Sequence, residues 1–360
     1  MPTISPTTHA TLRRFGAAAF AFCLAAAMPI RMQAGEVTLN ESGSTLLYPL
    51  FKIWVENYTA NHPGVSITLN ATGSEAGIKK AITGEVQIGA SDVFMSDRQS
   101  RENPQVLNIP LCISAQMVNY NLPGLNTEKL KLDGTVLTGI YSGTIRDWDA
   151  APIAALNPNL KLPHQAIIPV RRSEGSGDTY IFTQFLSFSD SKWSDDHGFG
   201  LTVQWPAVPG SLEAAGNEGM VQTIQKTPYS VGYVGVSYSK EIADAGLGTA
   251  LLKNQAGNFL LPTKDAVEAA AAGLGTRTPA DERLTIVLAP GDNAYPLIAY
   301  EYALVSNKQS DPAVATAIRN FLTWSIVPSE TNDGYLDSVH FIPLPPQIWA
   351  LSEAQIQSVK

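Results

Sequence analysis

Apolar and polar positions alternate along this chain with two periods, one typical of strands and one typical of helices. The segment 36–64 begins with the apolar-rich EVTLN, passes through the loop letters ESGST, and enters the periodic run LLYPLFKIWVENY. We expect a strand, a loop and then a helix that begins near Ser44 and Thr45, which are both good N-cap residues. The helix is expected to end near Asn61, just before a Pro-Gly pair.

The same order of elements occurs twice more. A strand over 65–70 leads through TGS into a helix over 75–83, and the short strand VQIGASD follows. In IIPVRRSEGSGDTYIFTQFLSF, a strand again leads through a Ser/Gly loop into a helix. Such alternation predicts an α/β fold with parallel-rich sheets and flanking helices. Ligands of these folds bind where strands end and helices begin.

The rest of the chain is less regular. Between residues 129 and 162 we expect a strand and two short helices, near 137–142 and 150–156. Later segments predict a helix near 217–226, the strand VGYVGVSY, a helix in KDAVEAAAAG, a long strand in NAYPLIAYEYALVSN and a helix in PAVATAIRNFLTWSIV. The sequence has no internal repeat and no flexible linker, which fits domains joined by crossing strands.

Residues 1–34 have the composition of a secretory signal peptide. Arg13 and Arg14 precede the apolar run FGAAAFAFCLAAA, which is too short to span a bilayer comfortably. We expect cleavage after Ala34, with Ala27 as the alternative site and an uncleaved N-terminal anchor as the competing interpretation. Cleavage would remove three arginines and make the mature chain more negative than the −8 of the full sequence.

The composition narrows the class of partner. The chain has 360 residues, of which 44% are hydrophobic and 16% charged, which leaves room for two domains. A negative charge without basic runs argues against nucleic acid or an acidic membrane as partner. After cleavage Cys112 stands alone in an apolar run, so no internal disulfide can form and a buried structural thiol is expected. No second stretch reaches membrane-span length, and we expect a soluble mature protein.

Hydroxyl residues gather at the expected helix starts. Thr45 and Leu46 fall in a first helical turn, where main-chain N–H groups lack intrahelical acceptors, and Ser74 has the same setting in TGSEAG. Hydroxyls and free amides together form a neutral anion cradle. Each motif alone is more typical of a plain N-cap than of a binding site. Three such units in one chain favour a site for a tetrahedral anion, which needs donors from several directions.

Charged residues stand beside these helix starts. Asp92 ends the strand GASD, and RRSEGSGD supplies Arg172, Ser176 and the amide of Gly177. A guanidinium fork suits contact with two oxygens of an anion, although a salt bridge with Glu174 is the alternative role for Arg172, and both can hold.

Other chemistries find no support in the motifs. The phosphate-loop pattern G-x-x-x-x-G-K-[ST] is missing, and EGSGD lacks the first glycine of the nucleophile elbow G-x-S-x-G. The four histidines that follow the leader have neither metal-ligand spacing nor a neighbouring nucleophile; they are His62, His164, His197 and His340. We therefore expect no catalytic residue, no metal and no cofactor.

The ordered motifs resemble the periplasmic phosphate-binding proteins, the solute receptors of Pst-type ABC phosphate importers. The resemblance runs over nearly all of the mature chain, through SGSTLLYPLFKIW, TGSEAGIKKAITGEVQIGASD, IYSGTIRDWDAAPIAALNPNLKLP, VRRSEGSGDTYIFTQFLS and VGYVGVSY. It implies a two-lobed periplasmic binding protein fold, type II-like, whose lobes are joined by crossing hinge strands. Lobe 1 would hold 35–118 and 296–360, and lobe 2 would hold 119–295. It also implies a periplasmic monomer that binds inorganic phosphate and meets ABC permease subunits at the membrane.

The resemblance also assigns site residues by motif position. Thr45, Leu46 and Ser74 would bind through hydroxyls and amides, Asp92 would accept a hydrogen bond from the ligand, and the second lobe would add four more binding residues. The full expected set is Thr45, Leu46, Ser74, Asp92, Arg172, Ser176, Gly177 and Asp178. Many family members have Thr where this chain has Asp178, and Glu174 replaces the usual Asp near the arginine.

A carboxylate beside an anion has a physical reason. Near neutral pH a phosphate still carries a proton, because its second pKa is about 6 to 7 by analogy with phosphoesters, whereas sulfate carries none. Asp92 would accept a hydrogen bond from the protonated oxygen of phosphate and would repel sulfate. If Asp178 also faces the ligand, binding should favour the monobasic form and tighten from pH 8 to 6. The alternative is that Asp178 caps its helix or pairs with Arg172.

Other functions on the same fold remain open at this point. A receptor for sulfate or another oxyanion is one, and a secreted phosphate hydrolase or transferase is another. A secreted phosphate-binding protein with a sensing or surface role would use the same pocket without transport.

Overall fold

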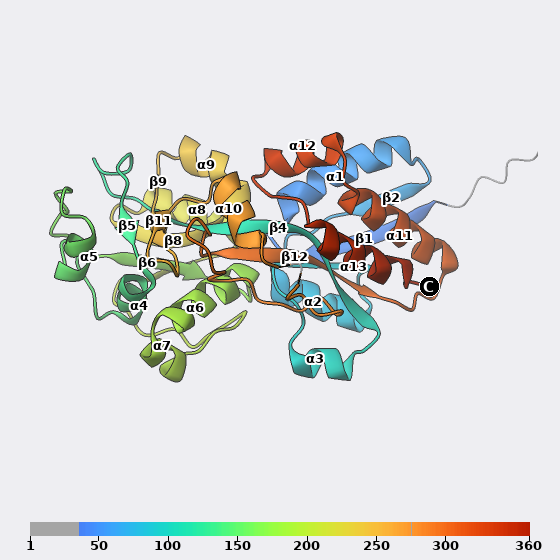
Figure 1. The fold of residues 1–360 in the computed structure, drawn as a ribbon, viewed down its shortest axis with the longest axis horizontal. Coiled ribbons are helices and arrows are strands. Elements are labelled where there is room, and N and C mark those ends of the chain that lie inside the picture. The colour runs from blue at the N-terminus through green and yellow to red at the C-terminus, as the bar shows by residue number, and fades with distance from the viewer. Residues whose placement is uncertain (1–35, 275) are drawn as a thin grey trace, which may run out of the picture. The chain divides into compact units, whose positions relative to one another are not determined.

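The computed structural model describes residues 36–274 and 276–360 (Figure 1). The expected signal peptide, residues 1–34, lies outside the described residues. The strands are β1 (Val37–Gly43), β2 (Val65–Thr68), β3 (Ile88–Ser91), β4 (Val106–Tyr120), β5 (Lys131–Leu132), β6 (Ile168–Arg172), β7 (Leu212–Ala214), β8 (Ser230–Gly235), β9 (Gly248–Thr249), β10 (Leu251–Lys253), β11 (Phe259–Leu260) and β12 (Ile298–Ser306).

The helices lie between these strands, singly or in succession, and three follow the last strand. They are α1 (Tyr48–Asn61), α2 (Ser74–Thr83), α3 (Asp97–Glu102), α4 (Gly134–Ser142), α5 (Ala151–Leu156), α6 (Gly177–Ser189), α7 (Ser191–Asp196), α8 (Gly216–Lys226), α9 (Ser239–Asp244), α10 (Lys264–Ala271), α11 (Pro312–Ile326), α12 (Glu330–Ser338) and α13 (Pro346–Gln357), with the 3-10 turn Val236–Tyr238 after β8. The predicted α/β class is confirmed. Of the C-terminal helices, the sequence pattern predicted α11 but not α12 or α13.

The main sheet has the strand order β2-β1-β3-β12-β4-β8-β6-β7, with β9 paired to β4, and a small sheet has the order β11-β10-β5. The outer strands of the main sheet pair in parallel, as β2-β1-β3 at one end and β8-β6-β7 at the other. The central pairs β3-β12, β12-β4 and β4-β8 are antiparallel. The sheet is therefore parallel at its two ends, where the strand–loop–helix units lie, and antiparallel between them.

Strand β4 connects the two parallel ends. It pairs with β12 along residues 106–115 and with β8 along residues 116–120. Almost all of its side chains are buried, polar ones such as Asn108 and Gln116 included, so its sequence lacks the regular alternation that marks a half-exposed strand. Cys112 lies within it as a buried free thiol, as the apolar run predicted. The change of partner falls close to residue 118, where the sequence placed a lobe boundary.

The first predicted unit starts its helix later than expected. Helix α1 begins at Tyr48, because residues 45–47 form a separate turn that Ser44 closes by accepting a hydrogen bond from the Leu47 N–H at 3.0 Å. Helix α6 begins at Gly177, and Ser176 is its N-cap. These starts place the hydroxyl-rich turns at the carboxyl ends of β1 and β6.

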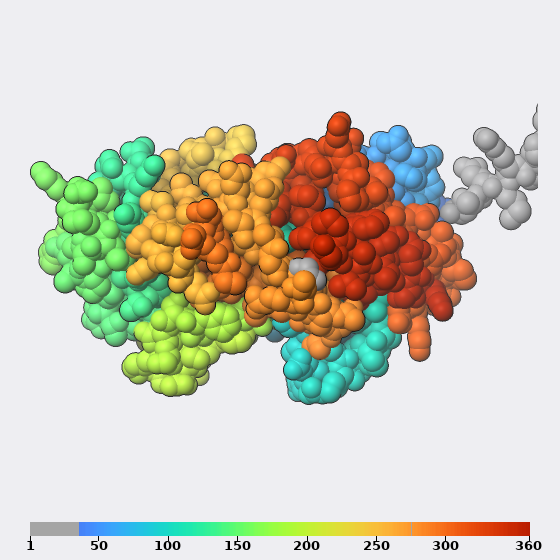
Figure 2. All heavy atoms as spheres, in the orientation of Figure 1, coloured from blue at the N-terminus to red at the C-terminus, as the bar shows by residue number. Residues whose placement is uncertain are grey.

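Helices α1 and α11 pack against each other through aromatic side chains, and α11 also contacts β1. Phe51 and Trp54 of α1 meet edge to face with ring centroids 5.7 Å apart, and Tyr58 meets Phe321 of α11 at 5.2 Å. The irregular segment between α10 and β12, with the C-terminal helices, forms much of the face shown in Figure 2. Among the described helices, none combines the length and apolar character that a membrane span requires.

Candidate functional site

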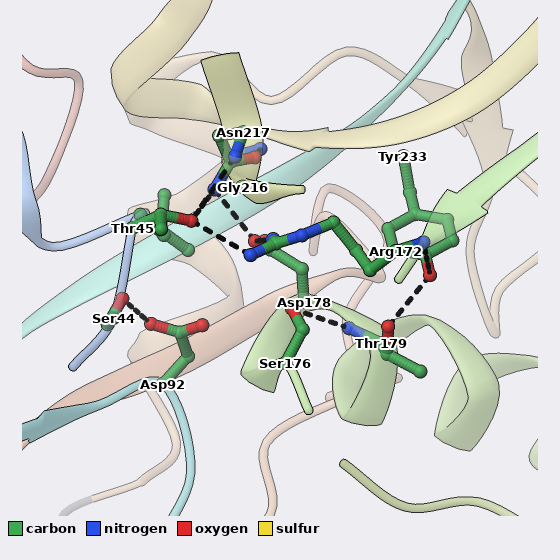
Figure 3. Close-up of polar contacts among 12 residues, drawn as sticks. Ser44, Thr45, Asp92, Arg172, Ser176, Asp178, Thr179, Gly216, Asn217 and Tyr233 are labelled. Atoms are coloured by element: carbon green, nitrogen blue, oxygen red, sulfur yellow. Dashed lines mark hydrogen bonds and ion pairs between the residues drawn. The ribbon is translucent and has the colours of Figure 1, made fainter. Parts of the chain in front are cut away.

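The loops that follow β1, β3 and β6 meet at one place (Figure 3). Thr45, after β1, accepts a hydrogen bond at its Oγ1 from Arg172 Nη2, the two atoms lying 3.1 Å apart. Arg172 is the last residue of β6. The contact joins segments 127 residues apart and brings together two of the motifs singled out in the sequence.

Asp92 lies beneath this contact and is buried. Ser44 donates a hydrogen bond to its Oδ1, and Ser74 donates to its Oδ2 at 3.1 Å. The third loop approaches closely, since a Cβ atom on Gly177 would stand 2.4 Å from Asp92 Oδ2. Only glycine fits that approach, so Gly177 allows the start of α6 to reach the carboxylate.

Five of the expected binding residues have main-chain N–H groups at these turns. The amides of Thr45 and Leu46 precede α1, those of Gly177 and Asp178 open α6, and that of Ser74 opens α2. Among the described residues, none of the five amides has a hydrogen-bond acceptor. Free N–H groups at helix starts form a neutral anion cradle, which is the arrangement the sequence predicted.

Arg172 supplies the positive charge and is nearly fully buried. Its Nε donates to Glu174 Oε1 at 2.8 Å and its Nη2 makes a second bond to the same oxygen, so the predicted pairing with Glu174 is confirmed. Burial opposes the charge of Arg172, but Asp178 and Glu174 outweigh it and raise its pKa. Burial likewise opposes ionisation of Glu174, yet the arginine lowers the pKa of that carboxyl below its ordinary value.

The carboxylate of Asp178 is fully engaged inside the protein. Its Oδ1 accepts from Gln116 Nε2 at 3.0 Å, and its Oδ2 accepts from Arg172 Nη1 at 2.5 Å and from Asn217 Nδ2 at 2.7 Å. The alternative in which Asp178 pairs with Arg172 therefore describes the geometry. Both oxygens of Asp178 already accept hydrogen bonds within the protein, and one of them is paired with Arg172. This argues against the hypothesis that the Asp178 side chain accepts a hydrogen bond from a second ligand proton.

Asn217 was missed by the sequence reasoning. Its Nδ2 donates to Thr45 Oγ1 at 3.0 Å as well as to Asp178, and its Oδ1 accepts from the Gly235 N–H at 2.8 Å. It stands in the first turn of α8, so the start of α8 is a fourth loop–helix junction at the site. The Gly-Asn pair in EAAGNEGM was the available signal, but it matches an ordinary turn equally well.

The electrostatics of the site centre on its buried acids. Burial, and then the charge of Asp178, raise the pKa of Asp92 to about 6. Burial and the neighbouring Asp92 hold the pKa of Glu301, on β12, well above its ordinary value. Asp92 is thus ionised near neutral pH and accepts hydrogen bonds from hydroxyl donors. An ionised carboxylate is what an acceptor for a proton-bearing ligand oxygen requires.

Two cavities border the site. One of about 350 Å³ is lined by Thr45, Asn217 and Glu174, and one of about 590 Å³ is lined by Glu75 and Glu174 among others. A separate cavity of about 370 Å³ between α4 and α7 shares no lining residue with the expected set. The described residues contain no group of three or more His, Cys, Asp or Glu side chains arranged to hold a metal ion.

Comparisons with known proteins agree with this arrangement. Residues 32–329 match the family model of the PBP superfamily domain. The phosphate-binding protein PstS of Methanocaldococcus jannaschii is 32% identical, with 93% of this chain and 94% of that protein aligned. The protein of the same name from Pasteurella multocida is 31% identical, with 88% and 89% covered.

A solved structure supports the fold. The phosphate-binding protein from Stenotrophomonas maltophilia superposes with a TM-score of 0.66 at 19% identity, covering 89% of this chain and 94% of that chain. The predicted two-lobed periplasmic binding protein fold is confirmed by this likeness and by the family model. The chain therefore belongs to the PBP superfamily and, within it, to the family of the PstS phosphate-binding proteins.

Proposed function

We propose that this protein binds inorganic phosphate at the junction of the β1, β3 and β6 loops and delivers it to an ABC-type membrane importer. The observation that carries the proposal is the buried Asp92 beside the start of α6, within a ring of free amides and one arginine. The relatives named phosphate-binding protein PstS support the same ligand.

The donors are divided by kind. The hydroxyls of Thr45 and Ser176, together with the free amides, among them that of Ser74, bind phosphate oxygens, and Arg172 neutralises part of the negative charge. Leu46, Gly177 and Asp178 contribute main-chain N–H groups. The carboxylate of Asp178 positions Arg172 and does not meet the ligand. All eight expected residues keep a role, and only that of Asp178 changes.

Asp92 gives the site its selectivity. Phosphate near neutral pH keeps a proton that can be donated to Asp92, whereas sulfate has no proton and meets a buried negative charge. A site that pairs a ligand hydroxyl can reject an analogue without it by about 10⁴-fold. Sulfate should therefore bind far more weakly than phosphate, although the two anions have the same shape.

Ligand exchange requires the loops to separate. With lobe 1 as 35–118 and 296–360 and lobe 2 as 119–295, a small number of hydrogen bonds cross between the lobes near the site. They include those of Arg172 and Asn217 to Thr45 Oγ1, of Gln116 to Asp178, of the Glu75 N–H to the Gly175 carbonyl at 3.2 Å, and of Ser237 Oγ to the Leu46 carbonyl at 2.7 Å. Opening breaks these few polar contacts and exposes the amides. We propose a periplasmic monomer, exported by its leader, whose lobe rims meet the permease subunits.

Isothermal titration of the purified mature chain, freed of endogenous phosphate, tests the ligand. Phosphate should release or absorb heat with one site per chain at pH 7.5, and sulfate should give no titratable signal at the same concentrations. Equal binding of both anions would remove the selectivity assigned to Asp92. Binding of neither would overturn the proposed function.

A further inference from the structure

Glu301 is a buried acid that the binding scheme above does not use. It lies on β12, the strand that pairs with β3 just ahead of Asp92, and its side chain has no exposed surface. Ser114 of β4 donates to its Oε1 at 2.5 Å. Its Oε2 is buried and, within the described part of the chain, receives no hydrogen bond from any donor. An acceptor left unpaired in the core costs about 1–3 kcal/mol, so its surroundings need an explanation.

The neighbour of Glu301 is the selectivity residue. Tyr302 pairs with Ser91 between the antiparallel strands β12 and β3, so Glu301 and Asp92 are the next residues along these two strands, and both side chains are buried. Each of the two carboxyl groups acts on the pKa of the other. Two carboxylates have no hydrogen to share unless one of them is protonated. Asp92 already accepts from Ser44 and Ser74, which is the environment of an ionised acid. The geometry therefore puts the proton on Glu301, which has a single hydroxyl donor.

Charge leads to the same assignment. Asp178 and Glu174 both pair with Arg172, and Asp92 is a third carboxylate within reach of the same positive charge. A fourth ionised acid, fully desolvated and beside an anion-binding site, would add repulsion without a partner.

We propose that Glu301 is a positioning residue for phosphate binding. Its protonated carboxyl group donates a hydrogen bond to Asp92 and so keeps Asp92 ionised and oriented toward the ligand hydroxyl. The inference rests on the proposed function and names the residue that maintains its selectivity. A neutral donor behind Asp92 strengthens the acceptor without adding charge to the site.

The groups that face this pair come from every element around it. Besides burial, the charges of Asp92 and of Asp178 on α6 raise the pKa of Glu301, and the charge of Arg172 on β6 opposes burial and lowers the pKa of Asp92. Besides burial, the charge of Glu301 in turn raises the pKa of Cys112 on β4 and of Tyr302 on β12. Burial raises the pKa of Cys112 and of Tyr302, so both stay neutral near pH 7. Burial, followed by the charge of Asp92, raises the pKa of Glu301 in the direction that the assigned proton needs.

Two substitutions and one matched control test the assignment by phosphate titration at pH 7.5. Glu301→Leu removes the donor, and since a hydrogen bond to a charged group is worth about 1.5–3 kcal/mol, we expect phosphate affinity to fall about 10- to 100-fold. Glu301→Gln keeps a neutral N–H donor and should restore affinity to within about threefold of wild type. Glu282→Gln changes another fully buried acid, bonded to Ser352 and Gln355 outside the site, and controls for loss of a buried carboxyl.

The opposite charge state makes an opposite prediction. If Glu301 were ionised, Glu301→Gln would delete a negative charge beside an anion, and both phosphate and sulfate would bind at least about tenfold more tightly. That tightening, or an equal loss in both Glu301 variants, overturns the proposal. Should Glu301→Leu fail to fold, the comparison of Glu301→Gln with wild type still decides between the two charge states.

Infrared spectroscopy gives a readout that needs no ligand. In protein labelled with ¹³C-glutamate, the phosphate-free wild type at pH 7.5 should show a protonated-carboxyl band that disappears in Glu301→Gln. Glu41 and Glu282, whose pKa values burial raises to about 8, contribute bands of their own, so the difference spectrum between variant and wild type is the measurement. The band survives even if phosphate does not bind, which separates this inference from the proposed function; a flat difference spectrum contradicts it.

Discussion

Arg172 Nη1 lies 2.5 Å from Asp178 Oδ2, and both side chains are withdrawn from solvent, with 1% and 0% exposed. The cation of the site is therefore held in place by the protein before any anion arrives. Preorganisation of this kind lowers the entropy that binding must remove. The same ion pair neutralises the negative charge of Asp178, so that its carboxylate does not contact the ligand.

Removing the partner of Arg172 should cost stability. Asp178→Ala leaves a buried guanidinium with only Glu174 and Thr45, and we expect the free energy of unfolding without phosphate to fall by about 3 kcal/mol. Urea denaturation measures it. Asp244→Ala breaks the exposed pair with Lys240 and should leave the unfolding midpoint nearly unchanged, since water screens that pair. Equal midpoints for both variants would contradict the account.

Asn217 should matter for binding although it was not expected from the sequence. Asn217→Ala removes the bonds to Thr45 Oγ1 and Asp178 Oδ2, so both groups lose orientation, and phosphate affinity should fall about tenfold in titration calorimetry. Asn254→Ala is the matched control, because Asn254 is an equally buried amide that bonds the carbonyls of residues 291, 292 and 294. That variant should lose stability and keep its affinity. The reverse result would place Asn217 outside the site.

The rejection of sulfate should depend on pH. Burial and the charge of Asp178 raise the pKa of Asp92 to about 6, so Asp92 gains a proton as the pH falls through that value. A protonated Asp92 donates instead of repelling, and we expect the ratio of phosphate to sulfate affinity to fall at least about tenfold between pH 7.5 and 5. Asp92→Asn should show a low ratio with little pH dependence. A wild-type ratio that stays constant over this range would argue against the role of Asp92.

Stability should also vary with pH through a second buried acid. Burial raises the pKa of Glu282 from 4.5 to about 8 in the folded protein, so its stabilising contribution is complete below about pH 4.5 and is lost as pH rises toward 8. Glu282→Gln should match wild type at pH 5 in urea unfolding. At pH 8.5 it should be more stable, by about 4 kcal/mol at most. Parallel pH profiles for the two proteins would show that Glu282 does not titrate as described.

The sequence predicted the strand–loop–helix units because their loops carry recognisable turn chemistry. It placed Thr45, Ser74, Asp92 and Arg172 at helix starts or strand ends, and the structure brings these together. Strand β4 escaped prediction as a strand because burial on both faces removes the alternation of apolar and polar residues. The boundaries assigned to the two lobes stay a prediction.

The parts of the site that were missed depend on tertiary contacts. Ser44 matched an N-cap, and the structure makes it both the cap of the turn before α1 and a donor to Asp92. Glu301 is the one charged letter within the apolar strand IAYEYALV, which was a usable sign of a buried acid. Its partner Asp92 lies 209 positions away along the chain, and no local pattern relates the two.

A crystal structure of the mature protein with bound phosphate would locate the anion relative to Asp92. We expect one phosphate among the three loops, with an oxygen about 2.5–2.7 Å from a carboxylate oxygen of Asp92, as a charged hydrogen bond requires. Its other oxygens should meet the Arg172 guanidinium and the amides of Leu46 and Gly177. Phosphate bound only in the cavity between α4 and α7, or an Asp92 turned away from the anion, would contradict this expectation.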